Sequence, residues 1–320
     1  MFTSQTGRTQ LLGVWTLCAA LVWSVPSAAQ SILVLKSRDL PQYNEAVNGF
    51  IQEWTAHGTG AAIQTRSLTD GADDFARAQM DPNSRPLAII AVGTDAARWA
   101  ITNSTVPVVF CMVSNARQSV MADLAPADET RVHGVSLDIP APAQLEVLKT
   151  YLAGAKRIGV IYDPRKTAAV VQDLEDATAK MGLQLVREPV TSESSVPEAV
   201  GRITPKIDVL WTPVDSTVFN SRSAQFILTQ MLQRKVPVMG FSENMVRAGA
   251  LLGFRVAYAD AGRQAATLLQ ATLQTASVVT PNIQTPRSYQ VLINGRVLEL
   301  LGNTIPPEAI RQASIIDHEE

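Results

Sequence analysis

The sequence predicts an α/β protein with two lobes, each a doubly wound parallel sheet covered by helices on both faces. From Ser31 onward, short β-branched runs alternate with helical patterns, as is typical of βαβ units. Runs such as Leu87–Val92 are continuously apolar rather than alternating, which indicates strands buried on both faces. The length of 320 residues allows two domains of about 150 residues each.

The elements follow from this patterning along the chain. The predicted strands are Ile32–Lys36, Ala62–Leu68, Leu87–Gly93, Val106–Val113, Val132–Leu137, Arg157–Tyr162, Leu183–Val190, Val209–Thr212, Val236–Phe241, Ala250–Val256 and Tyr289–Asn294. The predicted helices include Pro41–Ala56, Ala143–Leu152, Thr167–Met181, Ser216–Arg234 and Asp260–Thr275.

Two stretches of the chain resemble each other. In each, an apolar strand is followed at once by an aspartate, Asp95 or Asp215, then by a helix and a strand that opens Val-Pro-Val. The distance from Asp95 to Pro107 is 12 residues and that from Asp215 to Pro237 is 22, so the second helix is expected to be about three turns longer. The alternative is coincidence within a common supersecondary unit, but the ordered pair favours two similar lobes with Asp95 and Asp215 on opposite walls.

The N-terminus has the pattern of a secretory signal peptide. Arg8 precedes the apolar run Leu11–Trp23, and small residues, Ser27 and Ala29, stand at the −3 and −1 places of a cleavage site. The run is shorter than the roughly 20 residues of a membrane-spanning helix. We expect residues 1–29 to be cleaved near Ala29 and the protein to reach the periplasm; the alternative is an uncleaved amphipathic or membrane-spanning N-terminus.

Neither cysteine indicates a lipid anchor or an internal disulfide in the mature chain. Cys18 lies inside the apolar run and not after small residues, which disfavours a lipid anchor. Cys111 lies in an apolar strand and is predicted to be a core residue.

Composition and motifs disfavour several functions. A net charge of −2 with no basic run argues against nucleic-acid binding. The histidines, His57, His133 and His318, show no metal-ligand spacing. The stretch Gly134–Asp138 lacks the second glycine of a nucleophile elbow, and no phosphate-binding glycine loop is present. We therefore expect a binding protein without catalytic residues, cofactor or metal.

A ligand is expected in the crevice outside the carboxyl ends of the strands. The polar residues that follow the strands, and are predicted to bind the ligand, are Ser37, Thr94, Asp95, Ser114, Asn115, Ser136, Tyr162, Asp215, Thr217, Ser242 and Glu243. Asp215 and Glu243 are candidates to hold an ammonium group, and Asp215 is the leading one. The alternative for several of them is a helix cap, since Ser, Thr, Asp and Asn are preferred there.

Each lobe is expected to be built from two separate segments of the chain. The predicted first lobe comprises residues 30–138 and about 257–283, and the second comprises residues 139–256 and about 284–320. The crossings are expected near Leu137–Pro142, Arg247–Val256 and Ile283–Tyr289.

Several segments resemble the ABC-transporter substrate-binding family that includes tryptophan- and aromatic-amino-acid-type receptors. The segments that carry the resemblance, over about residues 85–310, are Pro107–Phe110 with Val113–Asn115, His133–Ser136, Lys156–Pro164, Pro213–Val218, Val236–Ala250, Tyr258–Ala266, and Leu292–Asn294 through Pro307. The chain departs from the family where Asn115-Ala116 replaces a usual Asp-Pro and where Tyr162-Asp163-Pro164 is followed by Arg165-Lys166.

The resemblance implies a type I periplasmic-binding-protein fold with three inter-lobe crossings. It also implies a monomer that captures a small polar molecule, an amino acid or related carboxylate, and delivers it to an ABC permease in the inner membrane. One alternative is a sensory module that signals to a membrane kinase or cyclase, and another is an exported α/β enzyme.

Overall fold

The computed structural model describes residues 1, 31–57, 60–71, 85–122, 124–274, 283–302 and 305–316. The predicted signal peptide, apart from Met1, and His318 lie outside these residues. Within the described ranges, no helix is long and apolar enough to cross a bilayer.

The observed elements alternate as predicted. The strands are β1 (Ser31–Lys36), β2 (Ala62–Ser67), β3 (Ala88–Val92), β4 (Val108–Val113), β5 (Val132–Ser136), β6 (Arg157–Tyr162), β7 (Gln184–Pro189), β8 (Val209–Trp211), β9 (Val238–Met239), β10 (Leu252–Val256), β11 (Ile283–Gln284), β12 (Tyr289–Asn294) and β13 (Ser314–Ile316). The helices are α1 (Pro41–His57), α3 (Thr94–Asn103), α4 (Ala141–Tyr151), α5 (Pro164–Lys180), α6 (Val196–Ile203), α7 (Ser221–Gln233), α8 (Glu243–Arg247), α9 (Tyr258–Gln274), α10 (Gly295–Leu301) and α11 (Pro307–Gln312). The shorter helical turns are η1 (Leu68–Asp70), η2 (Arg117–Met121), η3 (Pro126–Asp128), η4 (Glu193–Ser195) and η5 (Thr204–Lys206).

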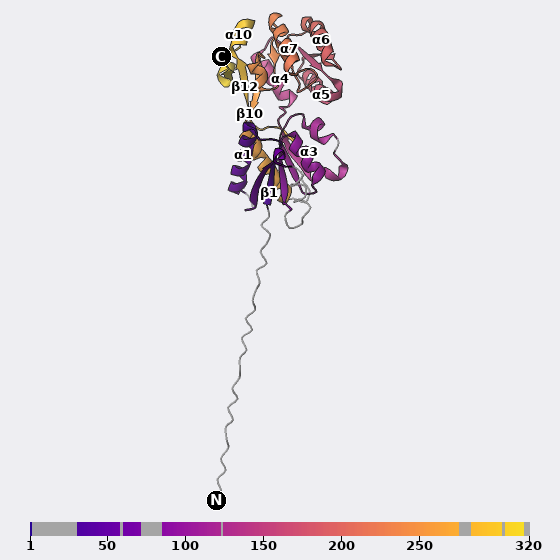
Figure 1. The fold of residues 1–320 in the computed structure, drawn as a ribbon. Helices are drawn as coiled ribbons and strands as arrows, with labels where there is room; N and C mark the ends of the chain where they lie inside the picture. The colour runs from indigo at the N-terminus through magenta and orange to yellow at the C-terminus, as the bar shows by residue number, and fades with distance from the viewer. Residues whose placement is uncertain are drawn as a thin grey trace.

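These elements form two lobes, one above the other in Figure 1. The first lobe holds a parallel sheet in the order β11-β5-β4-β3-β1-β2, and the second holds a sheet in the order β13-β12-β10-β9-β8-β6-β7. The chain passes between the sheets after β5, after β10 and after β11. The predicted α/β class with two parallel-sheet lobes is confirmed.

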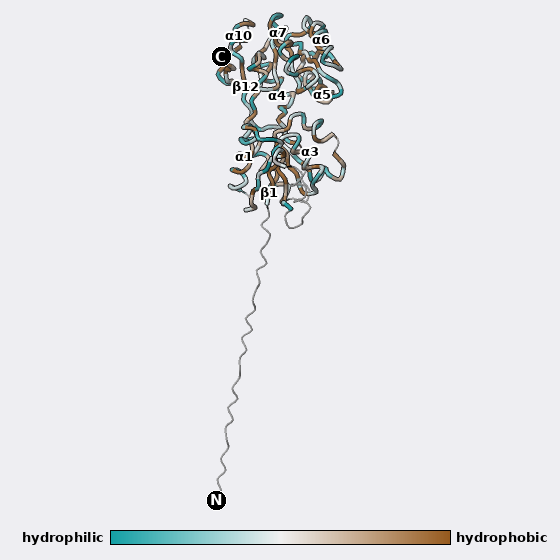
Figure 2. The backbone as a smooth tube through the Cα atoms, viewed as in Figure 1, coloured by the Kyte–Doolittle hydropathy of each residue, from teal (hydrophilic) through white to brown (hydrophobic). Residues whose placement is uncertain are grey.

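Each sheet is buried on both faces, which explains the continuous apolar strands. In β1, Ile32 and Val34 join the core beneath α1 and α9, whereas Leu33 and Leu35 join the core beneath α3. In the second lobe, one core packs against α4 and α5 and the other against α6 and α7. In Figure 2, hydrophobic residues, drawn in brown, accordingly follow the strands at the centre of the first lobe. Cys111 is fully buried in this core, as predicted, and its burial raises the pKa of the thiol to about 12.

The helices α1 and α9 lie far apart in the sequence and side by side in the first lobe. Gly49 of α1 faces the backbone of Ala259, and Gly262 of α9 faces the backbone of Ala46. A side chain at either glycine would overlap the partner backbone, so this close approach requires glycine.

Two strands of the second sheet depart from the parallel arrangement, β12 and its parallel neighbour β13. β12 runs antiparallel to β10, with Tyr289 beside Val256. The chain reaches β12 directly from β11 of the first lobe and therefore enters the second sheet at the end that faces the first lobe. It reaches β6 only after α4, and β6 runs parallel to its neighbours β7 and β8.

The duplicated unit is less symmetric than expected. The helix after Asp215 was expected from Ser216, but α7 begins at Ser221, where Asn220 caps it in a capping box. α7 has 13 residues and α3 has 10, so the prediction of three extra turns is wrong. Three of the additional residues lengthen the helix, and the others lie before it, where residues 216–220 form a turn.

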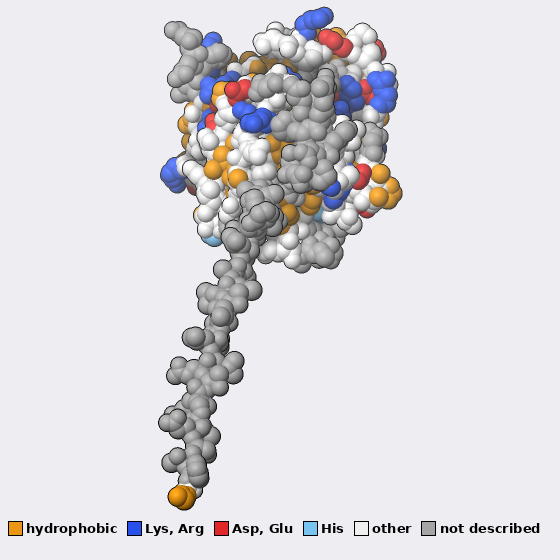
Figure 3. Space-filling view, turned by 60° about the horizontal axis from the view of Figure 1, so that its bottom comes forward, with side chains coloured by type: hydrophobic (Ala, Val, Ile, Leu, Met, Phe, Trp, Pro, Cys, Tyr) orange, Lys and Arg blue, Asp and Glu red, His pale blue; other side chains and the backbone are white. Residues whose placement is uncertain are grey.

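The outer surface carries charges of both signs. On the part of the face in Figure 3 that is drawn in colour, basic and acidic side chains are interspersed.

Candidate functional site

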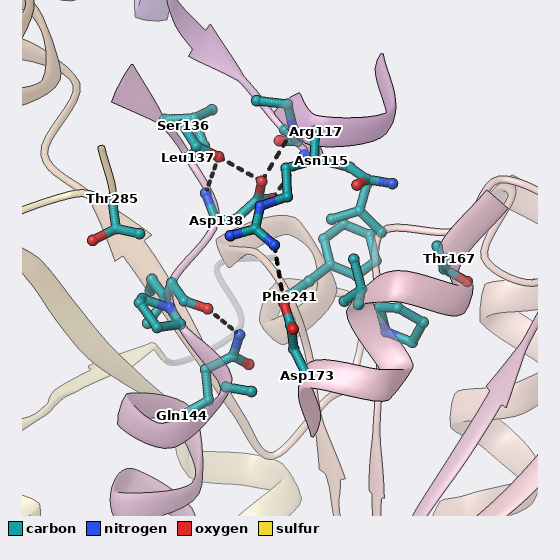
Figure 4. Close-up of a pocket in the computed structure, with 18 of the residues that line it drawn as sticks. Asn115, Arg117, Ser136, Leu137, Asp138, Gln144, Thr167, Asp173, Phe241 and Thr285 are labelled. Carbon is teal, nitrogen blue, oxygen red and sulfur yellow. Dashed lines mark hydrogen bonds and ion pairs between the residues drawn. The ribbon is translucent and has the colours of Figure 1, made fainter. Parts of the chain in front are cut away.

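A cleft of about 740 Å³ lies between the lobes and takes its lining from both. The first lobe contributes the residues after β4 and β5, including Asn115, Arg117 and Asp138. The second lobe contributes one side of α5, together with the residues after β8 and β9. These positions follow the carboxyl ends of parallel strands, where ligands of open α/β sheets bind. Figure 4 shows side chains from both lobes directed into this space.

Aromatic rings and small polar groups share the cleft wall. The aromatic side chains are those of Trp211, Phe241, Phe254 and Tyr258. An apolar wall with a few placed polar groups is the usual composition of a small-molecule site.

Asp138 organises the first-lobe side of the cleft. Its Oδ1 accepts a hydrogen bond from the backbone N–H of Asn115 at 2.8 Å, and its Oδ2 accepts one from the N–H of Ala116 at 3.3 Å. The Ser136 hydroxyl also donates to Oδ2. Asn115 has a φ of 49°, a left-handed conformation that asparagine tolerates better than most residues. Asp138 therefore holds the loop that follows β4 against the inter-lobe connection.

Two contacts cross the cleft from this loop. The Arg117 guanidinium lies 3.9 Å from the carboxylate of Asp173 on α5. The side-chain amide of Asn115 donates to the backbone carbonyl of Lys166 at 3.3 Å. The loop after β4 thus touches the opposite lobe at two points.

Gln144 ties the inter-lobe connection to the second sheet. Its Nε2 donates to the carbonyl of Ile139 at 2.7 Å, and its Oε1 accepts from the Trp211 indole N–H at 2.8 Å. The indole ring at the cleft wall is therefore fixed by a residue that also holds the connection.

Glu243 lies at the cleft but is already neutralised. Its carboxylate pairs with Arg255 at 2.6 Å and with Arg247 at 2.8 Å. Hydrogen bonds from Arg255 and then Arg247 lower the pKa of Glu243 from 4.5 to about 2, although burial opposes the shift.

Asp215 and Asp163 form a buried network in the second lobe. The carboxylate of Asp215 accepts from the N–H of Asp163 at 2.7 Å, the hydroxyl of Thr167 at 2.8 Å and the N–H of Thr217 at 2.9 Å. Asp163 accepts from the Thr217 hydroxyl and from the Arg165 guanidinium. The hydrogen bonds from Arg165 hold the pKa of Asp163 well below its usual range.

The predicted ligand-binding residues separate into two groups. Those that line the cleft are Ser114, Asn115, Ser136, Ser242 and Glu243. Those outside its lining are Ser37, Thr94, Asp95, Tyr162, Asp215 and Thr217.

Several residues of the second group have structural partners instead. The Ser37 hydroxyl accepts from the N–H of Ala96 in the first turn of α3. Asp95 is 60% exposed and pairs with Arg38 at 3.5 Å. Asp215 is only 1% exposed and both of its oxygens are engaged, so a role as the ligand's anchor stays a prediction. The expected placement of Asp95 and Asp215 on opposite walls of the cleft is not seen, since neither residue is part of its lining.

Sequence reasoning missed the residues of the inter-lobe connection and of α5. Asp138 and Gln144 lie in or beside the Pro-rich segment recognised as a crossing, and such a segment borders the cleft wherever it passes between lobes. That signal was sufficient to find them. Among the described residues, no group of three His, Cys, Asp or Glu side chains is placed to hold a metal ion.

Comparisons with known proteins agree with this architecture. The tyrosine-binding protein of Clostridioides difficile strain R20291 is 26% identical over 280 residues, which cover 82% of this chain and 77% of that protein. A ligand-free, open substrate-binding protein with adhesive properties from Clostridium difficile superposes with a TM-score of 0.71 at 22% identity, over 91% of this chain and 100% of the other. A domain from Streptococcus pneumonia in complex with L-Trp superposes with a TM-score of 0.60 at 20% identity, over 90% and 99%.

The structural likenesses place the fold in the type I periplasmic-binding-protein class, as the resemblance implied. A family model described as ABC transporter substrate binding protein matches residues 45–315, most of the chain. This chain therefore belongs to the family of ABC transporter substrate-binding proteins.

Proposed function

We propose that this chain is an exported solute-binding protein that captures an amino acid or related carboxylate between its lobes and delivers it to an ABC importer. The observation that carries the proposal is the cleft of about 740 Å³, which is lined from both lobes and bordered by an inter-lobe connection. A small-molecule ligand in this cleft would be held by groups of both lobes, which approach one another when the lobes close.

The relatives support the ligand class. One similar protein is named for tyrosine and one similar structure holds L-Trp. The aromatic side chains of this cleft suit a ligand with a planar apolar part. The family description supports an importer as the partner, and the N-terminal pattern of the sequence supports export to the periplasm.

Binding would act through closure. A ligand shifts the balance between open and closed forms only by its better contacts in the closed form. Chain segments that pass between the sheets after β5, β10 and β11 supply the hinge. No chemical change of the ligand is required, and the engaged carboxylates of Glu243 and Asp215 are in keeping with binding alone.

The test is a thermal-shift panel on the chain from Gln30 onward. The panel contains the common L-amino acids, their deamino analogues, simple carboxylates and sugars. A ligand present at 100 times its Kd adds about 2.7 kcal/mol, which raises Tm by roughly 5–10 °C for a domain of this size. Calorimetry then measures the affinity, and small-angle scattering follows closure as a fall in the radius of gyration. A panel in which no compound raises Tm would refute the proposal.

A further inference from the structure

The carboxylates that line the cleft differ in whether a cationic side chain forms an ion pair with them. They are Asp138, Asp173, Asp176 and Glu243. Glu243 pairs with two arginines, and Asp173 pairs with Arg117 across the cleft. These two negative charges already have cationic partners on the same chain, and the pair of Asp173 with Arg117 is exposed to solvent.

Asp138 and Asp176 form no ion pair with any lysine or arginine in the described ranges of the chain. Asp176 lies on the exposed side of α5 and accepts one hydrogen bond from Gln172. Asp138 is half-buried on the connection between β5 and α4. Water screens the charge of the exposed Asp176, whereas Asp138 is half-buried in the cleft wall, where its charge is screened less.

The surroundings of Asp138 hold its carboxylate in place without cancelling its charge. The donors are two backbone N–H groups, of Asn115 and Ala116, and the hydroxyl of Ser136. All three are neutral. Because a carboxylate offers about four acceptor positions, one remains for a ligand. Arg117, on the loop after β4, has its ion pair with Asp173, which is drawn as a dashed line in Figure 4.

We propose that the Asp138 carboxylate is the group that receives a cationic ammonium of the ligand, so that this cleft selects primary amines over their deamino analogues. The inference rests on the proposed function and specifies its ligand class. An ammonium group offers three donors and one positive charge, which supply what the fixed carboxylate lacks. The contact lies on a connection between the lobes, so it is available to a ligand that both lobes enclose.

Asp138 also differs from the two carboxylates that the sequence favoured for this role. Glu243 is held by two arginines, and Asp215 is buried among three donors outside the cleft lining.

The experiment is a calorimetric titration with a matched pair of probes. They are the L-amino acid with the largest thermal shift and its deamino analogue, such as L-tyrosine with 3-(4-hydroxyphenyl)propanoate. The wild-type chain is expected to bind the amino acid about 10- to 100-fold more tightly, as for a charge-assisted hydrogen bond worth about 1.5–3 kcal/mol. Asp138→Asn is expected to remove that preference and leave the affinity for the deamino analogue within about threefold.

Two further variants keep the result interpretable. Asp138→Glu retains the charge and is expected to retain a preference for the amine. Glu193→Gln removes an exposed carboxylate of the second lobe that is outside the cleft lining, and it is expected to change neither affinity.

The results that would overturn the inference are distinct from failure of the proposed function. Equal wild-type affinity for both probes, or an unchanged preference in Asp138→Asn, would overturn it. So would an equal loss of both probes in Asp138→Asn, since Asp138 would then act only by positioning the loop at Asn115. If the panel finds only amine-free ligands, solute binding stands and the ammonium inference fails. If the panel finds no ligand, the proposed function itself fails.

Discussion

Replacing Asp215 by alanine tests whether this carboxylate stabilises the second lobe through the hydrogen bonds that it accepts. The change removes the acceptor of three hydrogen bonds, from the N–H of Asp163, the hydroxyl of Thr167 and the N–H of Thr217. The Thr167 hydroxyl has another acceptor, the carbonyl of Asp163 at 3.3 Å. Two backbone N–H groups are then left without their partner.

The magnitude follows from these two groups. An unpaired buried donor costs about 1–3 kcal/mol. The N–H of Asp163 is buried and is expected near the upper end of this range, whereas Thr217 is half-buried and can turn to water. Removing a carboxylate from beside Asp163 relieves some like-charge repulsion. The expected net loss is about 3 kcal/mol, or a fall in Tm of roughly 6–12 °C.

The assay is thermal and urea unfolding of the chain from Gln30 onward, with Asp95→Ala as the matched control. Asp95 occupies the equivalent place in the first duplicated unit, but it is 60% exposed and makes one long ion pair. Its replacement is expected to change stability by less than about 0.5 kcal/mol. If the two variants lost similar stability, or if Asp215→Ala lost less than about 1 kcal/mol, the structural role assigned to Asp215 would be refuted.

Three other predictions concern the cleft contacts, acid stability and helix packing. Arg117 pairs with α5 across the cleft, so Arg117→Glu is expected to increase the radius of gyration of the ligand-free protein and to weaken ligand binding about two- to fivefold. The control is Arg187→Glu, which breaks an ion pair with α5 inside one lobe and should leave both measurements unchanged. Glu243 has its pKa lowered from 4.5 to about 2, so its contribution to stability is complete above about pH 4.5 and is lost as the pH falls toward 2. The free energy of unfolding of Glu243→Gln should therefore depend less on pH across that window. A pH profile identical to that of the wild type would contradict the ion pairs assigned to Glu243. Gly262→Ala places a methyl group against the α1 backbone and is expected to cost more than about 2 kcal/mol, whereas Gly201→Ala on the open side of α6 should gain about 0.5–1 kcal/mol, as measured by urea unfolding; equal effects would contradict the close packing.

The strand pattern could be predicted because it is local. Continuous apolar runs such as Leu87–Val92 carry the signature of burial on both faces in every window of the sequence. The short strands β11 and β13 were not predicted, since two or three residues are too few to show a period. The start of α7 was predicted five residues too early because Val218 and Phe219, in the turn before Asn220, continue the apparent helical spacing.

The candidate site was predicted only in part. The rule that ligands bind beyond the carboxyl ends of strands identified Ser114, Asn115, Ser136, Ser242 and Glu243, all of which line the cleft. The same rule also selected Asp215 and Ser37, whose side chains serve the backbone of their own lobes. A polar residue after a strand can face a neighbouring helix end as readily as a ligand, and the sequence does not distinguish the two directions.

By itself, the sequence determined the α/β class, the two lobes, the buried Cys111 and the family, because each depends on composition, periodicity or motif order along the chain. Only the tertiary structure decided which charges are free to act. Glu243 is neutralised by Arg247 and Arg255, and Asp138 receives only neutral donors. The electrostatic potential at a point in the cleft is a sum over charged neighbours that distant parts of the chain supply. That sum exists only once the lobes have folded and the connections between them have brought those neighbours together.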